Sequence, residues 1–162
     1  MDWRVKGTIQ KLLGVLPGGE PIHYWLQRLG GGLRRFGEEC DSKIEDLGLM
    51  IGHLRAAGVR VRGTRFLEVG TGWYPTFPLG LYVLGAARVD TFDLNRHLKP
   101  DLVRALVARL GAKPGALAAL DGDGDSAAAG RAERLARLAE RIARGATLEA
   151  ATDGCVVYRA PA

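Results

Sequence analysis

The sequence predicts an α/β fold with a parallel sheet, and three features of residues 65–95 support this prediction. Arg65–Val69 is a short apolar run suited to a buried parallel strand. A glycine-rich turn follows it, and a short helix is expected over Pro78–Leu84. A second strand is expected over Arg88–Phe92. Strand, loop, helix and strand in this order form the unit from which doubly wound sheets are built.

The loop after the first predicted strand has the residues of a ligand-binding turn. Gly70 and Gly72 allow the backbone to turn sharply and to approach a ligand without interference from a Cβ atom. Thr76 is the expected N-cap of the helix, which would supply unpaired N–H groups. Asp93 ends the second strand and follows Gly72 by about 20 residues, the spacing at which an acidic residue meets a ribose in doubly wound folds. The pattern indicates a ligand that contains a nucleoside.

Three classes of nucleotide ligand fit this pattern unequally. A phosphate-binding loop needs Gly-Lys-Ser/Thr at its end, and no lysine lies between Lys43 and Lys99. A dinucleotide fold prefers Gly or Ala at the sixth position of G-x-G-x-x-G, where this chain has Pro75. A nucleoside without a pyrophosphate does not require that close approach. An ordinary turn at the two glycines, with Asp93 capping the next helix, is the structural alternative.

Two segments resemble a known family. Leu67–Gly72, with the sequence LEVGTG, resembles motif I of class I S-adenosylmethionine-dependent methyltransferases. Thr91–Asn95 resembles the end of their second strand, and the string from Leu67 to Leu98 resembles a bacterial branch with a Gly-Thr-Gly-aromatic-x-Pro loop. The resemblance implies a Rossmann-like class I methyltransferase fold with S-adenosyl-L-methionine as the cofactor. It also implies methyl transfer to an O, N or C atom of an acceptor, for which a small molecule is the default.

The same resemblance implies roles for individual residues. Glu68 would help to place the aminocarboxyl end of the cofactor, and Asp93 would hold the ribose hydroxyls. The glycine loop would pack against the methionine and ribose parts. The cofactor-binding residues expected on this basis are Glu68, Gly70, Thr71, Gly72, Trp73, Asp93 and Asn95. No catalytic residue and no metal site are predicted.

The predicted strands cover only part of the resembled fold, whose seven strands are ordered 3-2-1-4-5-7-6. We expect residues 1–40 to form a helical appendage, and residues 41–162 to form a partial domain that stops after its third strand. The first strand would then lack a partner on one edge, which favours self-association or a partner chain. The chain is interpreted as a piece of a longer enzyme, with half of a two-chain enzyme and a non-catalytic binding module as alternatives. We expect the isolated chain to be inactive.

Apolar periodicity predicts the remaining helices. In the appendage, two helices are expected over Val5–Leu16 and Ile22–Leu29, the second carrying Tyr24 and Trp25 as candidate substrate contacts. A helix over residues 41–58 is expected to begin with a capping box formed by Ser42 and Glu45. Two further helices and a third strand are expected over Pro100–Gly111, residues 127–144 and Cys155–Tyr158.

Charge and cysteine content restrict the partners and the compartment. The formal net charge is +5, but the surplus of basic residues lies before Leu67 and not around the nucleotide-like unit. Nucleic acid stays open as a substrate without a clustered basic patch to indicate it. Cys40 and Cys155 lack C-x-x-C spacing, as expected of free thiols in a cytoplasmic protein. No apolar stretch has the length of a transmembrane segment.

Two other candidate sites are not supported by their spacing. Residues 121–126, DGDGDS, resemble the opening of a calcium loop, but Ser126 and Ala132 stand where glycine and an acidic residue are required. An acidic connector is the better interpretation. The three histidines, His23, His53 and His97, have no metal-ligand spacing, and no chemistry is assigned to them.

Overall fold

The computed structural model describes residues 36–113 and 125–161. Contacts within the chain divide it into two compact units, Met1–Glu39 and Cys40–Ala162. The described residues lie in the second unit, except for residues 36–39 at the start of the first described helix. Both helices predicted for the appendage, with His23, Tyr24 and Trp25, lie outside the described residues, as does most of the acidic connector.

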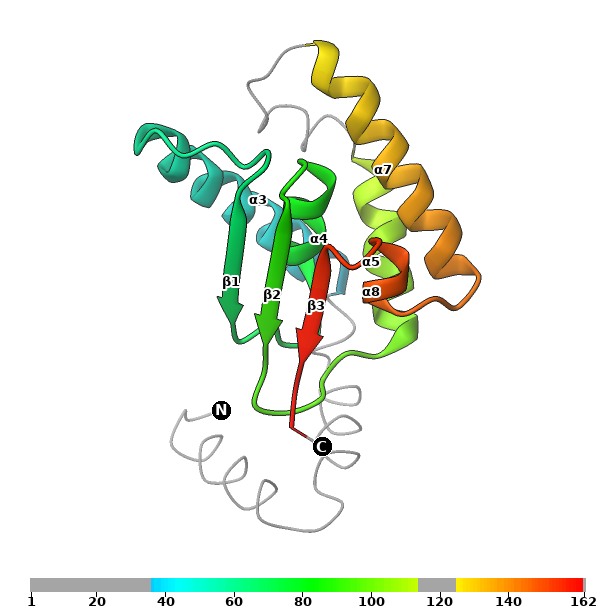
Figure 1. Ribbon diagram of the computed structural model, residues 1–162. Coiled ribbons are helices and arrows are strands. Elements are labelled where there is room, and N and C mark those ends of the chain that lie inside the picture. The colour runs from blue at the N-terminus through cyan, green and yellow to red at the C-terminus, as the bar shows by residue number, and fades with distance from the viewer. Residues whose placement is uncertain (1–35, 114–124, 162) are drawn as a thin grey trace. The chain divides into compact units, whose positions relative to one another are not determined.

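The described part is a mixed α/β structure built on a three-stranded parallel sheet (Figure 1). The strands lie in the order β1-β2-β3, so β2 is central and β1 and β3 form the edges. Helices separate the strands along the chain, and the arrangement is compatible with a Rossmann-like fold. In chain order the elements are α3 (Phe36–Ala56), β1 (Arg65–Val69), α4 (Thr76–Val83), β2 (Arg88–Phe92), α5 (Pro100–Ala112), α7 (Asp125–Ala143), α8 (Leu148–Ala151) and β3 (Val156–Arg159).

The strands agree with the sequence prediction more closely than the helix starts do. Strands β1 and β2 occupy the predicted residues, and β3 is shifted by one residue. The predicted capping box is wrong, because α3 begins at Phe36 and Ser42 lies inside the helix. Glu38 and Glu39 place negative charge in the first turn of α3, which stabilises this earlier start.

The start of α4 also differs from the prediction. Pro75 occupies the N-cap position, with a φ of −76° that its ring enforces, and Thr76 is the first helical residue instead of the cap. The backbone N–H of Thr76 donates to the carbonyl of Tyr74 over 2.8 Å. The short helix α8 was not predicted at all. The Thr147 hydroxyl caps it by accepting the N–H of Ala150 over 3.2 Å.

Helix α4 lies at the centre of the hydrophobic core. Seven of its eight residues are buried, as is typical of a helix that is apolar on all sides. It contacts β2, β3 and α7. On another side the fully buried side chain of Leu47 of α3 reaches the backbone of Gly80. Helix α4 therefore joins the sheet to the outer helices.

The two faces of the sheet differ in how they are covered. On one face the residues Val89, Thr91 and Val156 are each at most 1% exposed. On the other face Leu67 and Val69 are each 75% exposed. Figure 1 looks onto this second face, and helices α3 and α4 run behind the sheet. We call this surface the bare face. Strand alternation and register place on it Arg65, Leu67, Val69, Arg88, Asp90, Phe92, Val157 and Arg159.

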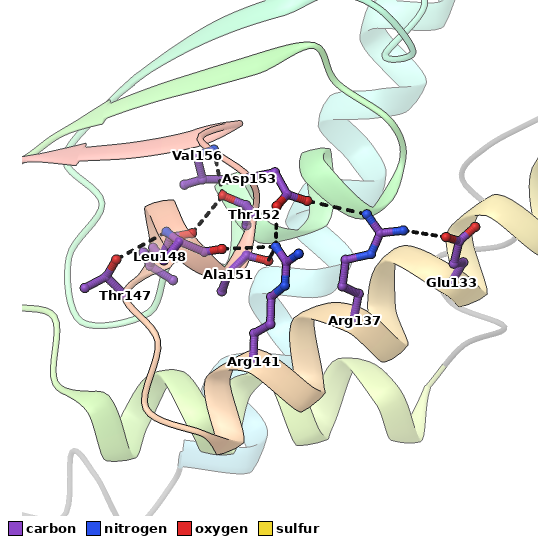
Figure 2. Close-up of polar contacts among 10 residues, drawn as sticks. Glu133, Arg137, Arg141, Thr147, Leu148, Ala151, Thr152, Asp153 and Val156 are labelled. Atoms are coloured by element: carbon purple, nitrogen blue, oxygen red, sulfur yellow. Dashed lines mark hydrogen bonds and ion pairs between the residues drawn. The ribbon is translucent and has the colours of Figure 1, made fainter.

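A network of polar contacts fixes the turn that leads into β3 (Figure 2). Asp153, whose φ is 53°, accepts bonds from Arg137 and Arg141 of α7, the latter over 2.5 Å. The contact with Arg141 is the main reason that the pKa of Asp153 is lowered. The Thr152 hydroxyl donates to the Leu148 carbonyl over 2.7 Å and accepts the Val156 N–H over 3.0 Å. These contacts connect α7, α8 and the first residue of β3.

Asp41 connects α3 to α5 and gives an acid-dependent prediction. Its carboxylate accepts two bonds from Arg109, over 2.9 and 2.5 Å, and lies 2.7 Å from the Lys113 ammonium. The hydrogen bond from Arg109 is the largest of the effects that hold the pKa of Asp41 far below its ordinary value. Stability from this contact is therefore present above the unfolded pKa of about 4 and is lost as the pH falls through the folded pKa.

Replacing Asp41 by Asn is expected to lower stability at neutral pH and to flatten the loss of stability below about pH 4. Urea unfolding midpoints measured at neutral and acid pH test this. Asp46→Asn, an exposed carboxylate on the same helix, is the control and should leave both midpoints unchanged. Parallel pH profiles for Asp41→Asn and the wild type would contradict the prediction.

Candidate functional site

The candidate site lies at the carboxyl ends of the three strands, where ligands bind in open parallel α/β sheets. Two loops meet there. The first connects β1 to α4 and runs over residues 70–75, and the second follows β2 over residues 93–99. The carbonyl of Phe92 accepts the Gly70 N–H over 2.8 Å at this edge. The loops are therefore neighbours because their strands pair.

Two glycines of the first loop have open space beside their backbone. Gly70 and Gly72 have φ values of 91° and 67°, in the left-handed region that favours glycine. Apart from the adjoining residues of the chain, a Cβ atom added to either glycine would have no atom of the described residues within 4 Å. A ligand can therefore approach both α-carbons closely, whereas a larger residue would be strained at either position.

Asp93 joins the two loops. Its Oδ2 atom accepts the backbone N–H of Gly72 over 2.6 Å, and its Oδ1 atom makes a long contact of 3.4 Å with the N–H of Asn95. The residue is only 7% exposed. Asn95 takes part in this contact through its backbone. Asp93 therefore orients the glycine loop, and its Oδ1 atom retains capacity to accept further hydrogen bonds.

Beneath the loop, Glu68 lies at the end of a chain of hydroxyl groups. The Thr91 hydroxyl donates to Oε2 of Glu68 over 2.5 Å and is also hydrogen bonded to the Thr71 hydroxyl. Both threonines are at most 2% exposed. The register that pairs Glu68 with Thr91 brings these side chains together. Burial raises the pKa of Glu68, and the Thr91 bond opposes this effect.

Glu68→Gln is expected to stabilise the fold at neutral pH. A raised carboxyl pKa means that stability is fully present below the unfolded pKa, about 4.3, and is lost as the pH rises through the folded pKa. The glutamine oxygen can still accept the Thr91 hydroxyl without a buried charge. Thermal unfolding should give a higher Tm for the variant at pH 7 and a smaller difference at pH 4. The control is the exposed Glu45→Gln, which should show no such pH dependence. A variant less stable than the wild type at pH 7 would mean that the charged hydrogen bonds outweigh desolvation.

An aromatic pair gives a second connection between the loops. The ring centroids of Trp73 and His97 are 4.7 Å apart, with 38° between the planes. From β3, the Tyr158 hydroxyl donates to the backbone carbonyl of Asn95 over 3.0 Å and accepts the backbone N–H of His97 over 3.3 Å. Groups from all three strand ends therefore hold the second loop.

The seven residues predicted from the sequence lie on β1, on the loop after β1 and on the loop after β2. The backbone of Gly72 and the side chain of Asp93 are in direct contact, and so are the side chains of Glu68, Thr71 and Thr91. Thr91, His97 and Tyr158 were not among the predicted site residues. Tyr158 could have been noticed because it lies near the end of a predicted third strand, at the same sheet edge.

Neither a metal site nor a membrane-spanning helix is found in the part of the chain that the structure describes. There, no group of three or more His, Cys, Asp and Glu side chains is arranged to hold a metal ion. Within the same described residues, no helix has the length and apolar character needed to span a membrane.

No protein-family model, no curated protein and no solved structure matches this chain. Function therefore has to be inferred from the residues and from the geometry in which they lie.

Proposed function

We propose that this chain binds S-adenosyl-L-methionine at the carboxyl edge of its sheet and carries the cofactor-binding part of a methyltransferase. The acceptor proposed is a small molecule. The main support is the 2.6 Å contact between the Gly72 N–H and Oδ2 of Asp93. It joins the glycine loop after β1 to the acidic residue that directly follows β2, and these two features form the sequence pattern for a nucleoside site.

The donor and acceptor groups at this edge suit an adenosyl ligand. Among the described residues, Oδ1 of Asp93 has only a long 3.4 Å contact, so it can accept a ribose hydroxyl without losing the bond to Gly72. The open space beside Gly70 and Gly72 would admit the ligand close to the backbone. No phosphate-binding lysine stands in this loop, which agrees with a ligand that lacks a pyrophosphate.

Methyl transfer needs little covalent chemistry from the protein. The cofactor supplies a methyl group already activated on a sulfonium, and alignment of donor and acceptor is the protein's main contribution. Asp93 would hold the ribose, and the glycine loop would lie against the rest of the cofactor. Glu68 would act from beneath the loop, through the hydroxyls of Thr91 and Thr71, which keep the loop in position.

A non-catalytic nucleotide-binding module is the second candidate, and one observation favours it. In the described sheet β1 is an edge strand, so its carboxyl end has a neighbouring strand on one side only. Such a site could hold a nucleoside without presenting it to an acceptor. Ligand binding without methyl transfer to any small-molecule acceptor would support this alternative.

Calorimetric titration with S-adenosylhomocysteine tests the proposal, with NAD and adenosine as comparison ligands. We expect saturable binding of S-adenosylhomocysteine, weaker binding of adenosine and no binding of NAD, since Pro75 stands where a pyrophosphate needs glycine or alanine. Circular dichroism on the same sample verifies the fold. Absence of binding by the folded protein, or preference for NAD, would contradict the proposal.

A further inference from the structure

The bare face has the properties of a binding surface. Leu67 and Val69 are each 75% exposed, and Phe92 beside them is 36% exposed. These side chains are neighbours, because Val69 and Phe92 are register partners on adjacent strands. Parallel sheets are normally covered on both faces, and contiguous exposed apolar groups indicate an interaction site.

The charges around this apolar centre are mainly positive. Arg65 and Arg159 are exposed, and Arg88 is paired with Asp90, the one acidic residue of the bare face, over 2.7 Å. Three arginines against one aspartate leave the bare face with an excess of positive charge. A surface that covers it should combine an apolar centre with acidic residues.

The outer side of α3 has this combination. Leu49 is 66% exposed, and it lies one helical turn after the exposed carboxylates of Glu45 and Asp46. The opposite side of the helix is buried through Ile44, Leu47 and Ile51. We call the side that carries Glu45, Asp46 and Leu49 the acidic face of α3.

We propose that the bare face of one copy of this chain binds the acidic face of α3 of a second copy. The carboxylates of Glu45 and Asp46 would approach the arginines of the bare face, and Leu49 would be buried against Leu67 and Val69. The contact places a helix on a parallel sheet, which is how such sheets are covered in α/β proteins. This inference is independent of the proposed nucleoside site.

The two surfaces lie on different sides of one copy, which determines the kind of assembly. Helix α3 packs on α4, and α4 covers the opposite face of the sheet, so the acidic face of α3 cannot reach its own bare face. The contact is therefore heterologous, and each bound copy keeps one unused surface. We expect association that increases with concentration and extends beyond a dimer, unless the assembly closes into a ring.

Complementary variants test this proposal. In the sheet variant, Leu67 and Val69 are both replaced by Glu, and in the helix variant, Glu45 and Asp46 are both replaced by Lys. Analytical ultracentrifugation of the wild type should show a mass that rises between micromolar and millimolar protein. Each variant alone should be monomeric, because one of its two surfaces repels the other. An equimolar mixture should form a mixed complex, since each variant supplies the surface that the other lacks.

The control for the sheet variant is Leu94→Glu, which changes an equally exposed leucine outside both surfaces and should associate like the wild type. Circular dichroism and thermal unfolding verify that each variant is folded, and the helix variant tests the contact separately from any change in the sheet. A monomeric wild type throughout the concentration range would overturn the proposal and indicate a different partner for the bare face. Wild-type-like association of either variant would also overturn it, as would a mixture that remains monomeric.

Discussion

Asp93→Ala is expected to weaken S-adenosylhomocysteine binding by roughly 10- to 100-fold. Hydrogen bonds to a charged group contribute about 1.5–3 kcal/mol each, and about 1.4 kcal/mol corresponds to a tenfold change in affinity. The substitution removes the proposed acceptor of the ribose hydroxyls. It also removes the acceptor that orients Gly72. Calorimetric titration measures the change in Kd.

The control for this variant is Asp90→Ala. Asp90 lies on the same strand but on the bare face, where it pairs with Arg88, so ligand binding should be unchanged. Asp93→Asn separates the two roles of the carboxylate. The amide oxygen can still accept the Gly72 N–H, but the amide group has only one acceptor oxygen and no charge. Weak binding by both Asp93 variants would support a direct contact between the carboxylate and the ligand. Wild-type affinity of Asp93→Asn would mean that Asp93 acts only by holding the glycine loop. Wild-type affinity of Asp93→Ala would remove Asp93 from the site.

Gly80→Ala is expected to destabilise the fold by up to about 2 kcal/mol, although alanine in a helix interior is intrinsically better than glycine by about 1 kcal/mol. A Cβ atom at residue 80 would lie 2.3 Å from Cδ2 of Leu47. Leu47 is fully buried, so its side chain cannot turn out into solvent to relieve the contact. Overpacking of this kind costs about 1–3 kcal/mol and exceeds the gain in helix propensity. Urea unfolding measures the free-energy difference.

Two further variants make the reason testable. Gly52→Ala in α3, where a Cβ atom would meet nothing within 4 Å, should be neutral or stabilising by up to about 1 kcal/mol. In a Leu47→Ala background, Gly80→Ala should become stabilising, because the added methyl group enters the space that the leucine vacates. Destabilisation that persists in that background would show that the contact with Leu47 is not the cause.

Local sequence signals were sufficient for the strands but not for the helix starts. The apolar run of β1 is followed directly by Gly70, and that of β2 is followed directly by Asp93, so each strand has a clear end in the sequence. For α3, the capping box at Ser42 was a valid local signal. It failed because the preceding residues continue the helix back to Phe36. A capping motif stabilises a helix start only where the residues before it are not helical. Packing decides where the helix begins.

The candidate site was partly predictable for a geometrical reason. Parallel strands end at one edge of the sheet, so loops after β1 and β2 had to lie near each other. The sequence did not indicate that Asp93 would bond the Gly72 N–H, or that Thr71 and Thr91 would connect to Glu68. Both contacts depend on the register of β1 against β2. The alternation of side chains does not fix this register, because a shift by two residues keeps every side chain on the same face of the sheet.

What the sequence determined by itself was therefore local: an α/β class, two strands, and a glycine loop with an acidic residue directly after the second strand. These follow from periodicity and from residues whose backbone preferences are strong. Tertiary structure alone decided which side of each element is buried. The exposure of Leu67 and Val69 and the burial of α4 both depend on how the helices cover the sheet. Contacts between residues distant in sequence decide this covering, and a pattern of apolar residues shows only that burial is favourable, not which partner provides it.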